Sequence, residues 1–124
     1  MSFVAQNNRF TRQDEYYRYI YTFLEQNTSP GEKIGYMANK RSYLLYGKNL
    51  DRWPIQVGVG QKMDQQTWLV FLKEQNIRVV AIGPGYSSNV TQMPEYQWLK
   101  NSNHFIPIYG EDVLAESVFF KLIR

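Results

Sequence analysis

Hydrophobic residues recur along the chain at spacings that alternate between those of helices and those of strands. Residues 14–27 carry an apolar stripe at helical spacing, which predicts an amphipathic helix. The residues of that stripe are Tyr16, Tyr17, Ile20, Phe23 and Leu24. Further short helices are predicted over 41–46, 64–75 and 95–100, with Asp64 as an N-cap and Pro94 just before the last of them. Strands are predicted over 33–37, 54–59, 78–82, 104–109 and 117–123.

The strand at 78–82 is almost continuously apolar, which is typical of a strand covered on both faces. We expect Ile77, Val79, Val80 and Ile82 to fill the centre of the sheet and both of its faces. Pro107, inside the strand at 104–109, indicates an edge position or a bulge.

The alternation of strands with helices predicts an α/β fold, because parallel strands need crossover connections. We predict a small Rossmann-like three-layer αβα sandwich with a mostly parallel sheet of about five strands. The last two strands have no helix between them, so an antiparallel C-terminal hairpin is expected at one edge. Residues 12–124 are predicted to form a single domain, and residues 1–11 a polar lead-in that can stay disordered.

Composition excludes several classes of site. The 124 residues include no cysteine, so disulfides, thiolate metal sites and cysteine nucleophiles are absent. The single histidine, His104, stands near the start of an apolar strand and is interpreted as a strand-end residue. No motif for metal or phosphoryl-transfer chemistry is present, so neither a metal nor a cofactor is expected. No apolar run approaches the ~20 residues of a membrane helix, and the first residues lack a secretory signal.

The net charge of +3 is unevenly distributed. Residues 33–62 hold six cations against one carboxylate, a local net charge of +5. These cations are Lys33, Lys40, Arg41, Lys48, Arg52 and Lys62. They form either a weak anion-attracting face or a solvated basic surface. They are too sparse for a dedicated nucleic-acid binder, so no nucleic-acid partner is expected.

Three loops are expected to meet where the parallel strands end, which is where open sheets of this class bind ligands. Cations and closely approachable backbone amides there would suit a phosphate or a sugar phosphate. The candidate ligand-binding residues are Lys40, Arg41, Lys62, Gly83, Gly85, Tyr86, Ser87 and Ser88. No constellation of nucleophile, base and carboxylate emerges, so the catalytic residues are unknown.

The order of elements from about Tyr16 onward resembles one kind of domain. The segments that carry the likeness are YIYTFLEQNTSPGEKIGY (19–36), YLLYGKNL (43–50), WLVFLKEQNIRVVAIG (68–83), YQWLKNSNHFIPIYGED (96–112) and VFFKLI (118–123). Together they resemble the extracytoplasmic C-terminal soluble domain of membrane glycosyltransferases that use polyprenyl-phosphate sugars, the dolichyl-phosphate-mannose-protein mannosyltransferase-like family. The catalytic carboxylates of that family lie in loops between membrane helices that this sequence lacks, so no catalytic residue is carried over.

The resemblance implies a non-catalytic accessory domain on the extracytoplasmic side, which binds an acceptor or organises a membrane-embedded glycosyltransferase portion. Two alternatives remain open. One is a small cytoplasmic Rossmann-like protein or enzyme that binds a nucleotide or phosphate ligand through the three loops. The other is a protein-interaction domain.

Overall fold

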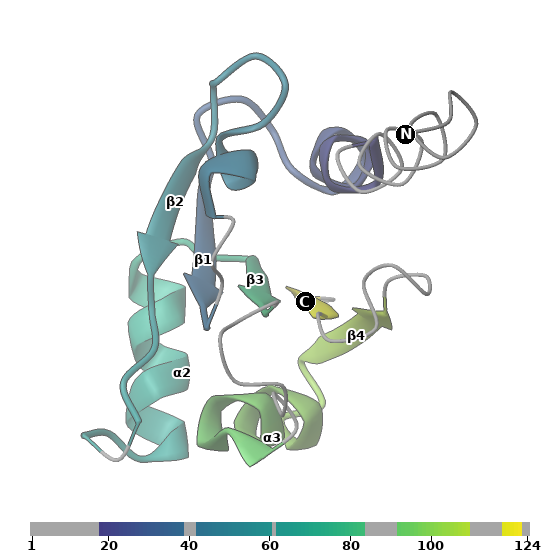
Figure 1. Cartoon of the computed structure of the whole chain (residues 1–124). Coiled ribbons are helices and arrows are strands. Elements are labelled where there is room, and N and C mark those ends of the chain that lie inside the picture. Colours follow the sequence, from purple (N-terminus) through teal and green to yellow (C-terminus); the bar gives the residue numbers. More distant parts are fainter. Residues whose placement is uncertain (1–17, 39–41, 61, 84–91, 110–117, 123–124) are drawn as a thin grey trace, which may run out of the picture.

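Five short strands form one mixed sheet in the computed structural model, which describes residues 18–38, 42–60, 62–83, 92–109 and 118–122. They are β1 (Lys33–Met37), β2 (Trp53–Gln56), β3 (Val79–Ile82), β4 (Phe105–Tyr109) and β5 (Val118–Leu122). Their order across the sheet is β2-β1-β3-β5-β4 (Figure 1). β1 pairs in parallel with β2 and β3, whereas β5 is antiparallel to both β3 and β4. The predicted α/β class is confirmed, with a parallel core and an antiparallel C-terminal part.

The predicted antiparallel hairpin at one edge is also confirmed. Phe105 stands opposite Leu122, and Pro107 stands opposite Phe120. β4 is the outermost strand, so the missing N–H of Pro107 is tolerated there, as predicted for an edge strand. The last strand of the chain lies between β3 and β4. Antiparallel pairings are therefore as frequent as parallel ones, and the sheet is mixed rather than mostly parallel in its pairings.

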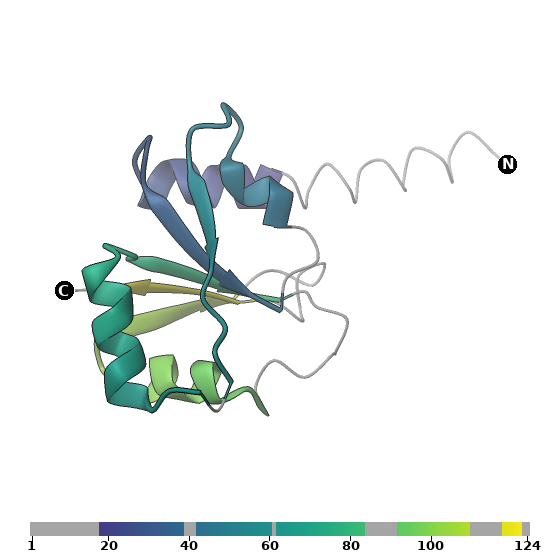
Figure 2. The ribbon, with the colours of Figure 1, turned by 90° about the vertical axis from the view of Figure 1, so that its left-hand side faces the viewer.

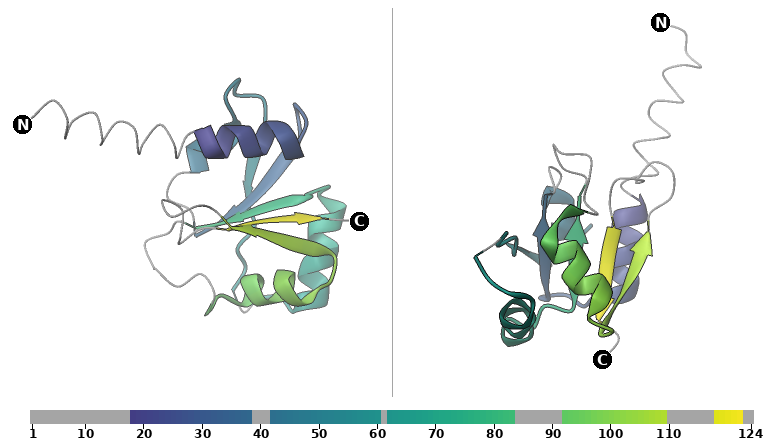
Figure 3. Two further views of the ribbon diagram at one scale, coloured as in Figure 1. Left: turned by 90° about the vertical axis from the view of Figure 1, so that its right-hand side faces the viewer. Right: turned by 90° about the horizontal axis from the view of Figure 1, so that it is seen from below.

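Helices cover both faces of the sheet (Figures 2 and 3). One face carries the helical residues 18–27 and the short 3-10 helix η1 (Ser42–Tyr46). The opposite face carries α2 (Gln65–Glu74) and α3 (Pro94–Asn101). The predicted lead-in at residues 1–11 and the predicted first turn of the helix at 14–17 lie outside the described residues.

The central strand β3 is buried on both sides, as the sequence predicted. Val79 and Ala81 belong to the apolar cluster beneath the helix at 18–27. Val80 and Ile82, with Ile77 just before the strand, belong to the cluster beneath α2 and α3. All five residues are at most 2% exposed. Each face of the sheet therefore has its own core, and β3 contributes buried residues to both of them.

Most helix ends follow the expected local chemistry. Asp64 is the N-cap of α2, and its Oδ1 accepts a hydrogen bond of 2.8 Å from the backbone N–H of Thr67. The pKa of the Asp64 carboxyl lies below its ordinary value. The larger cause is the hydrogen bond from the backbone N–H of Thr67, and the second is a hydrogen bond from the Thr67 side chain. Pro94 is the first residue of α3.

Two predicted elements differ from the structure. Residues 42–46 form a 3-10 helix rather than part of an α-helix over 41–46. β2 ends at Gln56 although a strand over 54–59 was predicted. Val57 N still donates to Tyr36 O of β1, but Val59 N and Gly60 N donate to the Glu95 carboxylate instead. That competing acceptor ends the strand.

A buried guanidinium joins the helix at 18–27 to the segment that precedes β2. Arg52 is 4% exposed. Its Nε donates to Thr28 Oγ1 at 3.1 Å, its Nη2 donates to Thr28 O at 3.1 Å, and its Nη1 pairs with Asp51 Oδ1 at 2.7 Å. Its Nη2 also lies 3.4 Å from Leu24 O, in the last turn of the helix. The guanidinium therefore donates hydrogen bonds to backbone carbonyl oxygens at the C-terminal end of that helix, where the helix dipole is negative.

Candidate functional site

The site predicted at the carboxyl ends of the strands is described only in part. Lys40, Arg41, Gly85, Tyr86, Ser87 and Ser88 lie outside the described residues. Lys62 is exposed beyond the end of β2, in a turn where its backbone N–H donates to Val59 O. Gly83 is buried directly after β3, and its N–H donates to Met37 O at the end of β1. Gly83 has φ +73°, a left-handed conformation that favours glycine.

The basic segment 33–62 does not form one face within the described part of the chain. Lys33 begins β1 and its Nζ contacts Gln75 Oε1 near the end of α2. Lys62 comes after the end of β2, which runs parallel to β1, whereas Lys33 stands at the start of β1. Arg52 is buried and paired with Asp51, so it adds little to the surface potential. The proposed convergence of Lys40, Arg41 and Lys62 stays a prediction.

A carboxylate already occupies the backbone amides that follow β2. Glu95, in the first turn of α3, is 2% exposed. Its Oε2 accepts hydrogen bonds from Val59 N at 2.8 Å and from Gly60 N at 2.9 Å. Its Oε1 is buried without a hydrogen-bond partner. An external anion would have to displace Glu95 to use these two amides, so the loop after β2 is engaged by the protein itself.

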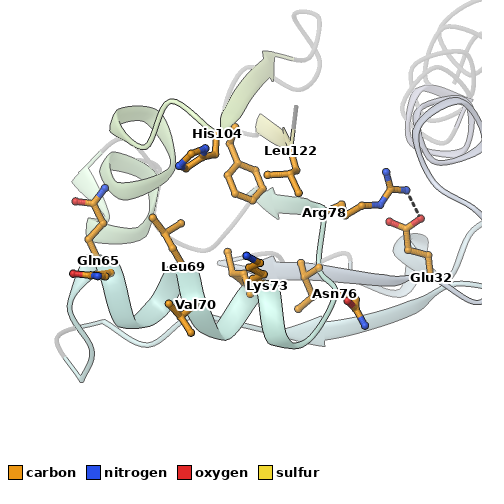
Figure 4. A pocket seen from close by; sticks show the side chains of 13 residues that line it. Glu32, Gln65, Leu69, Val70, Lys73, Asn76, Arg78, His104 and Leu122 are labelled. Atoms are coloured by element: carbon orange, nitrogen blue, oxygen red, sulfur yellow. Dashed lines mark hydrogen bonds and ion pairs between the residues drawn. The ribbon is translucent and has the colours of Figure 1, made fainter. Parts of the chain in front are cut away.

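A groove of about 930 Å³ lies at the other end of the sheet, where β3 and β4 begin and β5 ends (Figure 4). We call it the α2 groove, because α2 forms one of its walls. The opposite side is formed by His104, Phe105 and Leu122. Its volume falls within the range of about 300–1,000 Å³ that is typical of small-molecule sites.

The α2 groove combines an apolar lining with polar groups around it. The apolar lining residues are Leu69, Val70, Leu72, Ile77, Phe105 and Leu122. The polar and charged lining residues are Glu32, Gln65, Gln66, Lys73, Asn76, Arg78 and His104. Val70 is 48% exposed, so part of this apolar lining faces water. The groove can therefore accept the apolar part of a ligand while its polar groups fix the orientation.

One ion pair closes an end of the α2 groove. Arg78 Nη2 lies 2.7 Å from Glu32 Oε1, which also accepts a hydrogen bond from Ser29 N. The Arg78 side chain is 48% exposed, whereas that of Glu32 is only 12% exposed. Figure 4 shows this pair at the end of the groove away from Gln65.

His104 lies immediately before β4, as its interpretation as a strand-end residue predicted. Its backbone N–H donates to Ser102 Oγ at 3.2 Å, and its exposed side chain lines the α2 groove. The residue pattern along the chain does not reveal this groove. Its walls come from residues far apart in the sequence.

The described residues contain no group of three or more histidine or acidic side chains placed to hold a metal ion. Among the same residues, no helix has the length and apolar character needed to cross a lipid bilayer.

Comparison with known proteins adds no relative. No family model matches the chain, and neither the curated proteins nor the solved structures contain a significant match.

Proposed function

We propose that this chain is a non-catalytic binding domain that holds the apolar part of an acceptor or partner molecule in the α2 groove. The observation that carries the proposal is the groove itself, about 930 Å³ in volume, with an apolar lining and polar groups on both walls. Sites that bind small molecules share this composition, since apolar surface supplies affinity and a few polar groups supply orientation.

The exposure of Val70 supports the same proposal. A side chain that is 48% exposed on a helix that also supplies core residues leaves apolar surface open to water. Covering that surface with a ligand would contribute about 25 cal/mol per Å² of apolar area. The described groove therefore offers a favourable free energy of binding before any polar contact forms.

The resemblance in element order supplies the proposed setting. It supports a Rossmann-like accessory domain of a membrane glycosyltransferase, placed on the extracytoplasmic side, with the enzyme's acceptor or its membrane-embedded portion as the partner. In that setting the groove would receive an acceptor that has both an apolar part and a polar part. Because fold alone does not assign function, the groove and not the fold is the feature to test.

Octyl β-glucoside, below the concentration at which it forms micelles, is a suitable probe because it joins a sugar to an eight-carbon chain. We expect amide shifts by NMR at residues that line the α2 groove. V70K should weaken binding, because it places a charge on the exposed apolar wall while leaving the buried core intact. E74Q is the matched control, since it changes net charge by the same +1 on an exposed α2 residue that does not line the groove.

Shifts that are absent, scattered over the surface, or equal in V70K and the native chain would overturn the proposal. A change in E74Q as large as that in V70K would show that charge on the helix, and not the groove, controls binding.

A further inference from the structure

The α2 groove is lined by more positive than negative side chains. Lys73 projects from α2, and His104 lies on the opposite wall (Figure 4). Within the described part of the chain, neither side chain forms an ion pair. Arg78 is paired with Glu32, the one carboxylate among the described lining residues. The groove therefore has at least one uncompensated cation, Lys73.

Both walls of the groove contribute apolar surface. Leu69 and Val70 come from α2, and Phe105 and Leu122 come from the paired ends of β4 and β5. Phe105 is also part of the core beneath α2 and α3, so this side of the groove is anchored in the fold. A ligand that follows this surface would have its apolar body against these residues and its polar end within reach of Lys73 or His104.

We infer that the α2 groove selects small amphiphiles with an anionic head, of which a medium-chain carboxylate is the simplest form. This inference rests on the proposed function and adds the charge of the ligand to it. Complementarity of charge favours an anion because the cations at the rim outnumber the carboxylates. The apolar lining favours an alkyl or similar body, because each methylene removed from water adds free energy of binding.

Octanoate and octanol test the inference, because they differ in the charged head and share the length of the alkyl chain. At low salt, the dissociation constant measured by NMR should be lower for octanoate than for octanol. K73Q should weaken octanoate binding by about twofold to fivefold, the range expected for one exposed charge pair, and should leave octanol binding unchanged. K100Q is the matched control, since Lys100 is an exposed lysine of α3 outside the groove.

Two further measurements sharpen the test. High salt should weaken octanoate binding and leave octanol binding unchanged, since salt screens exposed charges. Lengthening the carboxylate should tighten binding by up to about fourfold for each methylene that enters the groove.

The outcomes separate this inference from the proposed function. If octanol and octanoate bind equally and K73Q affects neither, the groove is a binding site without preference for anions, and the inference fails alone. If neither compound nor octyl β-glucoside shifts the groove residues, the proposed function fails with it. If sedimentation shows a dimer that V70K dissociates, the groove is an interface between two copies, and the inference is overturned.

Discussion

Replacing Arg52 by methionine tests whether one buried guanidinium fixes the helix at 18–27 to the sheet. Methionine keeps an unbranched chain in the same space and removes every hydrogen-bond donor. The change leaves two oxygen atoms of Thr28 and the carboxylate of Asp51 without their partner. Because Arg52 is 4% exposed, water cannot readily replace the donors that are lost.

The magnitude follows from the contacts. Hydrogen bonds from a charged donor contribute about 1.5–3 kcal/mol each, so the two bonds to Thr28 contribute about 3 kcal/mol at the low end of that range. The Asp51 side chain is 30% exposed and can be rehydrated, so its ion pair adds under about 1 kcal/mol. R52M should therefore lose about 3–4 kcal/mol of the free energy of unfolding, a large share of the roughly 5–15 kcal/mol typical of folded domains.

Urea denaturation followed by far-UV circular dichroism measures this loss. The slope of the unfolding free energy against urea concentration should be the same in R52M and the native chain. R78M is the matched control, because the guanidinium of Arg78 is half-exposed and its ion pair should contribute about 1 kcal/mol or less. A loss in R52M below about 1 kcal/mol, or no larger than that in R78M, would refute the account of Arg52 as an anchor.

Four further predictions follow from other described contacts. V80D should leave the domain unfolded, because Val80 is 0% exposed and an unpaired charge there has no partner; a cooperative thermal transition of the variant would contradict this. E95Q should lower the free energy of unfolding, measured by urea denaturation, by about 2 kcal/mol. Two backbone N–H groups would lose a charged acceptor, and the new amide would place a buried donor where Oε1 has no partner. Unchanged stability would show that these bonds contribute little. The pKa of Asp64 is lowered in the folded state, so its ionised form stabilises the protein above the ordinary pKa of about 3.9. That contribution is lost as the pH falls through the lower folded value. The difference in melting temperature between the native chain and D64N should therefore shrink below about pH 4, and a difference independent of pH would exclude this linkage. Inorganic phosphate at low salt should shift only amides in the loops after β1, β2 and β3 if the predicted anion site exists, and scattered shifts would remove it.

Local elements were predictable because their signals are local. The short stretch KIGYM predicts a strand over 33–37, and the bounds of β1 agree with it. Asp64 and Pro94 mark helix starts through the chemistry of exposed N–H groups and of a fixed φ angle. The burial of β3 on both faces follows from its continuous run of apolar residues.

Contacts between distant residues were not predictable in the same way. Glu95 in a first helical turn indicates only a favourable interaction with the helix dipole, and nothing near it in the sequence points to Val59 and Gly60. Arg52 has the sequence appearance of a surface cation, yet its partner Thr28 lies 24 residues earlier in the chain. The α2 groove likewise requires knowledge of how α2 and the end of the β4–β5 hairpin come together.

The interior place of β5 has a consequence for biosynthesis. The ribosome delivers β4 before β5, yet β4 makes its sheet contacts through β5 alone. Until residues 118–122 have left the exit tunnel, β3 exposes one unpaired side and β4 has no strand beside it. The nascent chain can assemble the β2-β1-β3 part early, but completion of the sheet must wait for its last strand. The interval before β5 arrives is therefore when these open strand edges are most vulnerable to aggregation.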